Sequence, residues 1–284
     1  MDKLILASKH RPSAADHPAE GLRRFFLIVE YDGTDYCGWQ RQINGPSVQQ
    51  TLEEALSRLT GETIAVTGSS RTDAGVHAMC QTVHFDTESG VPDEKFAYAL
   101  NTMLPEDVRV RKSMSAEPDF HARFQARGKI YRYLIHNGPH ASAMYRNFRA
   151  HVMYDLDVDK MNREVQAMIG THDFAPFAAS GSIVKDTTRT IYNARVVRKG
   201  DLVMLLVHGN GFLYNMVRIL AGTLISVGTG KLEEGAIARA LESMSRLDLG
   251  VTAPAHGLTL MRVFYAYDEH EAGAYFEKLA RDGE

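Results

Sequence analysis

Hydrophobic and polar positions in the first half of the chain predict the order strand, helix, strand, strand, helix, strand. The apolar stretch 24–31 is rich in aromatic and branched residues, which predicts a buried strand. Ser47 and Gln50 form a capping box, and Gly61 ends the helix that they begin. Its apolar stripe is Val48, Leu52, Ala55, Leu56 and Leu59. Strands are also expected at 63–67, 79–85 and 107–114, with a second helix from about Pro92 whose inner face carries Phe96, Leu100 and Met103.

The second half of the chain repeats this order of elements without visible residue identity. Strands are predicted at 128–135, 190–198, 202–207 and 258–265, and helices at 158–169, 212–227 and 233–246. Asp157 is the expected cap of the first of these helices, and Gly170 is its expected end. The pattern therefore predicts an α+β fold of two βαββαβ units, each of the ferredoxin or RRM-like kind with an antiparallel four-stranded sheet.

We expect the two sheets to lie side by side with their helices packed on one side, and a cleft where the units meet. The expected boundaries are a disordered tail at 1–22, a first unit at 23–122, a second unit at 123–268 and a C-terminal tail or helix at 269–284.

Composition places the chain among soluble globular proteins. Of its 284 residues, 44% are hydrophobic and 24% are charged, and no apolar run reaches membrane-spanning length. The polar N-terminus shows no secretory signal. The two cysteines, Cys37 and Cys80, are far apart and give no disulfide framework. These features predict a cytoplasmic protein.

Charge is unevenly distributed along the chain. The formal net charge is −3, but residues 109–149 contain nine Lys and Arg residues against only Glu117 and Asp119. The remainder of the chain contains 23 basic and 33 acidic residues. A basic stretch on an acidic body fits a surface that faces phosphates, and it fits a solvated face equally well.

The stretch 68–78 between two predicted strands is too long for a tight hairpin and is rich in chemical groups. Gly68 and Gly75 allow the backbone to bend or to approach a ligand closely. Arg71 and Asp73 are two residues apart, so in an extended segment both side chains leave on the same side. A carboxylate beside a guanidinium stays ionised and can act as a nucleophile or base. The alternative is an Asx-type turn with an arginine clamp.

Residues elsewhere in the chain could join this loop in one site. Tyr131 is either a core aromatic residue or a platform on which a base stacks. The stretch 209–218 joins a strand to a helix start, where backbone amides suit an anion. Arg218 falls on an otherwise apolar helix face and needs a partner, because an unpaired buried charge is costly. Asp73 is the candidate partner.

Other catalytic arrangements find little support. His77, Cys80 and His84 are spaced like metal ligands, but His77 sits in the loop while the other two share a strand face, so we expect no metal site. The chain contains no glycine-rich phosphate loop with a lysine and no dinucleotide-binding fingerprint. Glycosidase chemistry would require a second carboxylate near Asp73, and the sequence indicates none.

Residues 71–78 (RTDAGVHA) resemble the signature of the TruA family of tRNA pseudouridine synthases. Further landmarks are similar and in the same order: 31–33 with 38–40, 120–124, 131–133, 170–174, 209–218 and 257–258. The resemblance spans about 25–267. One departure is Ser70, where the pattern usually has glycine.

The resemblance implies a cofactor-free isomerase that converts uridine to pseudouridine in the anticodon stem-loop of tRNA, around positions 38 to 40. Asp73 would be the nucleophile. Arg71 and Arg218 would guide the flipped backbone and pair with Asp73. Tyr131 would stack on the uracil and serve in proton removal, and Leu258 would pack against the ring. Chemistry at a glycosidic bond requires the base to leave the stack. The resemblance also implies a homodimer with tRNA lying across both subunits, and no membrane partner.

Two other functions remain open at this point. The basic stretch also fits a tRNA-binding or folding module whose isomerase activity is secondary or lost, although the presence of Asp73, Tyr131 and Arg218 argues against loss. An aspartate-dependent hydrolase of nucleosides would release free base instead of rearranging it.

Overall fold

The computed structural model describes residues 17–178, 186–266 and 268–282, which fall into two compact units. The first unit runs to Arg127 and includes Leu260–Ala266, and the second comprises Gly128–Thr259 with the residues from Tyr267 onward. Residues 1–16 of the expected N-terminal tail lie outside the described residues. The fold is of the mixed α+β kind, and its strand pairs are mostly antiparallel.

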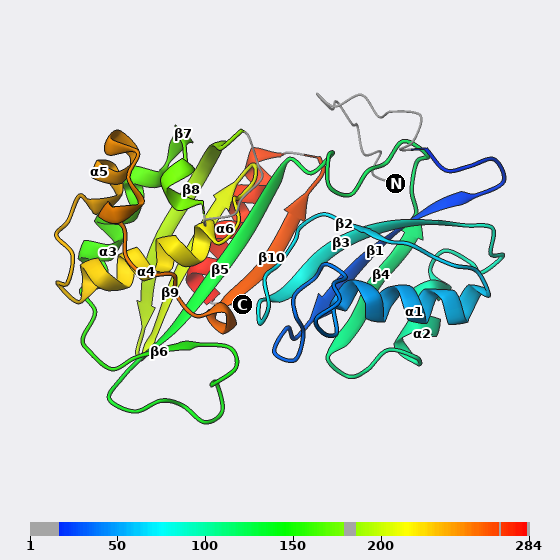
Figure 1. Cartoon of the computed structure of the whole chain (residues 1–284), viewed down its shortest axis with the longest axis horizontal. Coiled ribbons are helices and arrows are strands. Elements are labelled where there is room, and N and C mark those ends of the chain that lie inside the picture. Colours follow the sequence, from blue (N-terminus) through cyan, green and yellow to red (C-terminus); the bar gives the residue numbers. More distant parts are fainter. Residues whose placement is uncertain (1–16, 179–185, 267, 283–284) are drawn as a thin grey trace. The chain divides into compact units, whose positions relative to one another are not determined.

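The first unit has the predicted order of elements (Figure 1). They are β1 (Arg23–Tyr31), α1 (Val48–Thr60), β2 (Thr67–Gly68), β3 (His77–Thr87), α2 (Lys95–Asn101) and β4 (Val108–Ser115). The central strand β1 pairs antiparallel with β3 and β4, and β2 pairs with β3. Phe25 and Phe85 face each other across β1 and β3, and the ring of Phe96 on α2 packs against both, at 4.7 and 5.4 Å between centroids. This aromatic cluster joins α2 to the sheet.

The predicted caps of α1 are present, whereas the predicted strand at 63–67 is almost absent. The backbone N–H of Gln50 donates to the Ser47 hydroxyl at 3.3 Å, and Gly61 ends the helix at a φ of 76°. Of the predicted residues only Thr67 is in a strand, the two-residue β2 that it forms with Gly68. Side chains of α1 take its backbone donors, because the N–H of Ile64 bonds to the Ser57 hydroxyl and that of Val66 to the Glu53 carboxylate. These donors are then not available to a strand ladder.

The second unit contains more elements than predicted. They are β5 (Gly128–Asn137), β6 (Ala150–Val152), α3 (Val158–Val165), β7 (Gly170–Asp173), β8 (Thr188–Lys199), β9 (Leu202–Gly209), α4 (Met216–Gly228), α5 (Ala236–Ser243) and α6 (Glu269–Asp282). The strand order is β5-β9-β8-β7, and the short β6 pairs parallel with β5. The sequence missed β6 and β7. Asp157 caps α3 as expected, because its carboxylate accepts from the N–H of Lys160 at 2.8 Å.

Helix bounds in this unit also differ from the prediction. α3 ends at Val165 and continues only as a short 3-10 turn to Met168, so the predicted end at Gly170 was too late. α4 begins at Met216 rather than at residue 212, because Asn215 has a left-handed backbone with a φ of 61° that no helix interior accepts. Similarly, Met103 lies beyond the end of α2 and is 39% exposed instead of facing inward.

Helices of the second unit lie on both faces of its sheet, which corrects the expectation of one covered face. Asn162 of α3 accepts from the N–H of Val196, and α3 packs against β8. Arg195, the preceding residue, points to the other face of β8, where its guanidinium pairs with Glu277 of α6 at 2.8 Å. The two helices therefore cover opposite faces.

The last strand, β10 (Leu258–Phe264), was assigned to the second unit, yet Leu260–Ala266 groups with the first. The N–H of Arg127 donates to the carbonyl of Phe264 at 2.7 Å. The Tyr265 hydroxyl donates to the carbonyl of Ala122 at 2.7 Å and contacts the Thr82 hydroxyl. These buried bonds account for the difference from the predicted boundaries. No helix within the described ranges is both long and apolar enough to cross a membrane.

Candidate active site

The loop that carries Asp73 connects β2 to β3 in the first unit. The N–H of Val76 donates to the carbonyl of Asp73 at 3.1 Å, and Gly75 between them has a φ of 75°. A positive φ at the third residue of such a turn favours glycine. Arg71 is exposed, Thr72 buried and Asp73 half-buried. This alternation anchors the middle residue and leaves its two neighbours at the surface of the loop.

The segment that follows β1 supports this loop by close contact between backbones. A Cβ atom at Gly38, where φ is 92°, would lie 2.5 Å from the carbonyl oxygen of Thr72. A Cβ atom at Gly33 would lie 2.1 Å from the carbonyl oxygen of Val76. The N–H of Trp39 donates to the carbonyl of Thr72 at 3.1 Å. The two glycines are therefore required by the fit between the segment and the loop.

Side-chain hydrogen bonds anchor the part of the loop that precedes Asp73. The hydroxyls of Thr72 and Tyr31 share a hydrogen bond of 2.7 Å. The hydroxyl of Ser69 donates to the amide oxygen of Gln81 at 2.7 Å, and the amide nitrogen of Gln81 donates to the carbonyl of Ser70 at 2.6 Å. All five of these residues are buried. The position of Asp73 is thus set by a framework of buried polar contacts, as a preorganised site requires.

The residues weighed as metal ligands have structural partners. Nδ1 of His77 accepts the backbone N–H of Gly33 at 3.0 Å, and Nδ1 of His84 accepts that of Ala122 at 3.1 Å. Burial raises the pKa of the Cys80 thiol. Among residues 17–178, 186–266 and 268–282, no group of three or more potential metal ligands comes together.

Tyr131 lies on β5 in the second unit and is 7% exposed. It pairs with Val207 of β9 in the sheet. The ring of Phe212 meets the Tyr131 ring edge-on, with 5.0 Å between centroids. This arrangement fixes the ring plane of Tyr131, a condition for its proposed use as a stacking platform.

Arg218 lies in the first turn of α4 and is half-buried. Its Nε donates to the carbonyl of Ala253 at 2.9 Å, and one terminal nitrogen donates to Oδ1 of Asn215 at 2.7 Å. The N–H of Ala253 in turn donates to the carbonyl of Arg218 at 3.0 Å. The expectation that this arginine needs partners is confirmed, and two of them are neutral oxygens. Its pairing with Asp73 stays a prediction.

Leu258 begins β10 and is 6% exposed. The preceding Gly257 packs against Tyr133, since a Cβ atom there would lie 2.6 Å from the tyrosine ring. The Tyr133 hydroxyl donates to the carbonyl of Pro254 at 2.8 Å. Burial raises the pKa of Tyr133, and the nearby Arg218 cation opposes that rise. Arg218 and Leu258 therefore flank one segment, 253–257, of the second unit.

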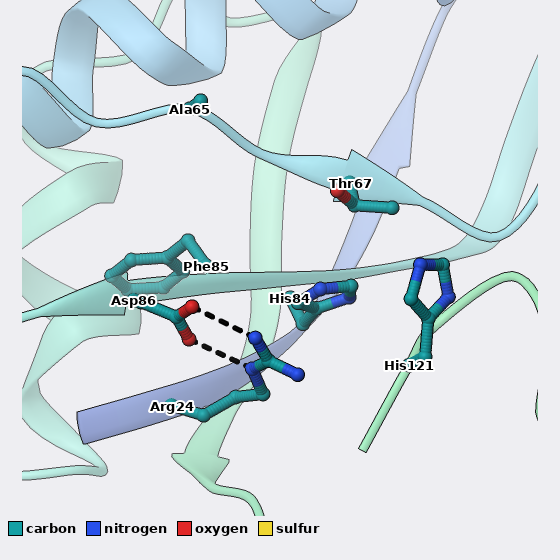
Figure 2. A pocket seen from close by; sticks show the side chains of 7 residues that line it. All are labelled: Arg24, Ala65, Thr67, His84, Phe85, Asp86 and His121. Carbon is teal, nitrogen blue, oxygen red and sulfur yellow. Dashed lines mark hydrogen bonds and ion pairs between the residues drawn. The ribbon is translucent and has the colours of Figure 1, made fainter. Parts of the chain in front are cut away.

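Two cavities lie in the first unit near the loop. One, of about 310 Å³, is lined by Arg24, His84 and His121, among others. Figure 2 shows Arg24 joined by two hydrogen bonds, both of 2.8 Å, to the carboxylate of Asp86. The second cavity, of about 270 Å³, is lined by Arg71 of the loop and by Arg123. Arg123 belongs to the landmark 120–124 and to the basic stretch 109–149, but the sequence assigned it no role.

Comparison with known proteins identifies the family. The family model described as "tRNA pseudouridine synthase" matches residues 27–125 and 165–266. The chain belongs to this family. Proteins named tRNA pseudouridine synthase A from Ruminiclostridium cellulolyticum and Acetivibrio thermocellus are 49% and 48% identical, each over 86% of this chain and 100% of the relative. A solved Cbf5-Nop10-Gar1 complex is similar at 15% identity with a TM-score of 0.38, over 90% of this chain and 56% of that chain, and adds nothing to the assignment. The resemblance predicted from residues 71–78 is confirmed.

Proposed function

We propose that the chain isomerises uridine to pseudouridine in tRNA, within the anticodon stem-loop around positions 38 to 40, and that Asp73 is the nucleophile. The membership of the tRNA pseudouridine synthase family supports the reaction and the substrate class. The anchoring of the Asp73 loop by Tyr31, Trp39 and Gln81 carries the assignment of the nucleophile, because it holds one carboxylate in a fixed place beside Arg71. One carboxylate serves whether the attack falls on the sugar or on the pyrimidine ring.

The roles of the other residues are those that the family resemblance implies, and the chemistry of each side chain suits its role. Tyr131 stacks on the everted uracil and serves in proton removal, and Leu258 packs against the ring. Arg71 and Arg218 guide the flipped nucleotide and keep Asp73 ionised. The proposal includes a cytoplasmic homodimer that binds tRNA and needs no cofactor. Sedimentation of the protein with and without tRNA tests the dimer.

The experiment that tests the function compares Asp73→Asn with Asp35→Asn on an unmodified tRNA transcript. Asp35 is an exposed acid in the segment that supports the loop, so it controls for the loss of one charge. We expect Asp73→Asn to lower pseudouridine formation on the order of 10³-fold or more, because no other group replaces a lost nucleophile. Binding of the transcript should change little in both variants, and Asp35→Asn should turn over normally.

The same assay separates the other two functions. Wild-type protein that binds the transcript and forms no pseudouridine would be a tRNA-binding or folding module. Release of free uracil, detected by chromatography, would indicate a hydrolase. Full activity of Asp73→Asn would remove Asp73 from the mechanism while leaving the family assignment intact.

A further inference from the structure

The cavity lined by Arg71 and Arg123 combines features that call for a negatively charged ligand. We name it the Arg71–Arg123 cavity. Its volume is about 270 Å³, and Trp39, Gln40 and Ser70 also contribute to its wall. Sites that hold whole small molecules usually measure about 300–1,000 Å³, so this one suits a single group of a larger ligand.

The two guanidinium groups line one cavity and influence each other, although both residues are exposed overall. Arg71 belongs to the Asp73 loop and Arg123 to the segment after β4. Burial and the neighbouring Arg71 charge both lower the pKa of Arg123. Neither guanidinium forms an ion pair with any other described residue, whereas Arg24, Arg41 and Arg111 are all paired with acids. Two like charges facing one cavity repel each other until an anion enters between them.

Ser70 is a second, independent sign of an unfilled polar site. The residue is 8% exposed, and its hydroxyl oxygen is buried without a hydrogen-bond partner among the described residues. Buried hydroxyls normally have a partner, so each exception calls for an explanation. The carbonyl of the same residue is bound by Gln81, which fixes the backbone at this point of the wall. An oxyanion in the cavity would bring acceptor oxygens to which the Ser70 hydroxyl could donate.

The wall is tightly packed at Trp39, and Glu53, the acid that the wall residue Gln49 contacts, is already paired. The Trp39 ring packs so tightly on Gly68 that a Cβ atom there would lie 2.6 Å from it. Gln49 in the wall donates to the carboxylate of Glu53 at 2.9 Å. Glu53 is paired with Arg41 at 3.2 Å and also accepts the N–H of Val66. Its charge therefore does little to repel an anion.

We propose that the Arg71–Arg123 cavity binds one phosphodiester of the tRNA backbone at or next to the nucleotide that Asp73 attacks, and that Arg123 is a substrate-positioning residue. This inference rests on the proposed function. Arg71 and Asp73 are two residues apart, and two residues of extended chain span at most about 7 Å. A phosphate held by Arg71 therefore belongs to the target nucleotide or to its neighbour. Two forked guanidinium groups are well suited to a phosphate.

The first test is the kinetics of Arg123→Gln on unmodified tRNA, with Arg111→Gln as the matched control. Arg111 comes from the same basic stretch but is exposed on β4 and paired with Glu30 at 3.4 Å. We expect Arg123→Gln to raise KM about tenfold while kcat stays within about threefold, as for the loss of one phosphate contact. Arg111→Gln should leave both constants within about twofold. Arg123→Lys keeps the charge and should fall between wild type and Arg123→Gln, and it replaces the Gln variant if that fails to fold.

The second test identifies the phosphate itself. Anticodon stem-loops carrying a single neutral methylphosphonate are bound to Asp73→Asn protein, which does not turn them over. In this background, we expect a methylphosphonate at one position beside the target uridine to weaken binding about tenfold. Once Arg123→Gln is added, the same methylphosphonate should weaken binding less than about twofold, because the contact between Arg123 and the phosphate is already lost. The slope of binding affinity against salt should also fall by about one in the double variant.

The outcomes distinguish this inference from the function on which it rests. Two results would overturn the phosphate site alone. One is normal wild-type turnover together with equal KM values for Arg123→Gln and Arg111→Gln. The other is a methylphosphonate effect on binding that is the same with and without Arg123. Absence of pseudouridine formation by the wild type, with the methylphosphonate coupling intact, would overturn the function alone. Competition by inorganic phosphate that depends on Arg123, without any methylphosphonate coupling, would show a free anion as the ligand and contradict binding of the RNA backbone.

Discussion

Replacement of Gly38 by alanine tests whether close backbone contact positions Asp73. The new Cβ atom would lie 2.5 Å from the Thr72 carbonyl oxygen and 2.9 Å from the carbonyl carbon of Asp73. Both are backbone atoms, which cannot rotate out of the way. The left-handed φ of 92° adds about 1–2 kcal/mol of strain for any residue with a Cβ atom. Overpacking typically adds about 1–3 kcal/mol, so we expect a total loss of about 2–5 kcal/mol in stability.

Relief of this clash would displace the Asp73 loop. Increasing the Thr72 contact from 2.5 Å to an ordinary separation of 3.4 Å requires a shift of about 0.9 Å. Misplacement of a catalytic group by about 1 Å can cost about 100-fold in rate. We therefore expect kcat of Gly38→Ala for pseudouridine formation to fall about 100-fold, measured at a temperature at which the variant is fully folded.

Gly61→Ala is the matched control for this substitution. Gly61 also has a left-handed backbone, with a φ of 76°, but its Cβ atom would meet nothing within 4 Å. The free energy of unfolding of Gly61→Ala, measured in urea, should be about 1–2 kcal/mol lower than that of the wild type, and its turnover should stay within about twofold of the wild-type value. A folded Gly38→Ala protein that turns over as fast as Gly61→Ala would refute the reasoning, because the loop would then not depend on the close approach.

Three further changes test the site and the fold. Arg218→Lys keeps the charge but loses the planar fork that bonds to Ala253 and Asn215, so kcat/KM should fall at least about tenfold; near-normal turnover would remove Arg218 from the site. Burial lowers the pKa of His208 to about 4 in the folded protein. Because this histidine takes up a proton in the unfolded chain already near its ordinary pKa of about 6.5, the free energy of unfolding should fall as pH drops from about 6.5 to about 4. Urea unfolding of His208→Gln should show a weaker pH dependence, and an unchanged one would contradict that assignment. Tyr31→Phe removes the bond to Thr72 and should cost about 1 kcal/mol, measured by thermal unfolding.

Elements with local signals could be predicted from the sequence, and those that depend on distant contacts could not. The caps of α1, Ser47 and Gly61, act within a few residues of the helix and were found. The predicted strand at 63–67 failed because hydroxyl and carboxylate groups of α1 bind its N–H donors. No pattern within the strand reveals that competition. β6 and β7 have only three and four residues, which is too short for a pattern of apolar and polar positions to predict a strand.

The same division applies to the candidate site. Arg71 and Asp73 were found because their chemistry is concentrated in one short loop. Arg123 lies more than fifty positions further along the chain, and only the folded first unit brings it to the same cavity. Gly33 and Gly38 stood in recognisable motifs, but the reason for glycine at each is a backbone atom of the Asp73 loop that no spacing rule identifies.

Arg218 shows how a correct physical requirement can leave its partner undetermined. A half-buried guanidinium needs acceptors, and sequence reasoning looked for them among acids because only side chains can be read from a sequence. The structure satisfies it in part with the Ala253 carbonyl, an acceptor that every residue carries, and with the amide of Asn215. Since the N–H of Ala253 also bonds back to the carbonyl of Arg218, backbone geometry fixes the plane of the guanidinium before any substrate binds. A lysine cannot reproduce that plane, which is why an equal charge at this position should not be enough.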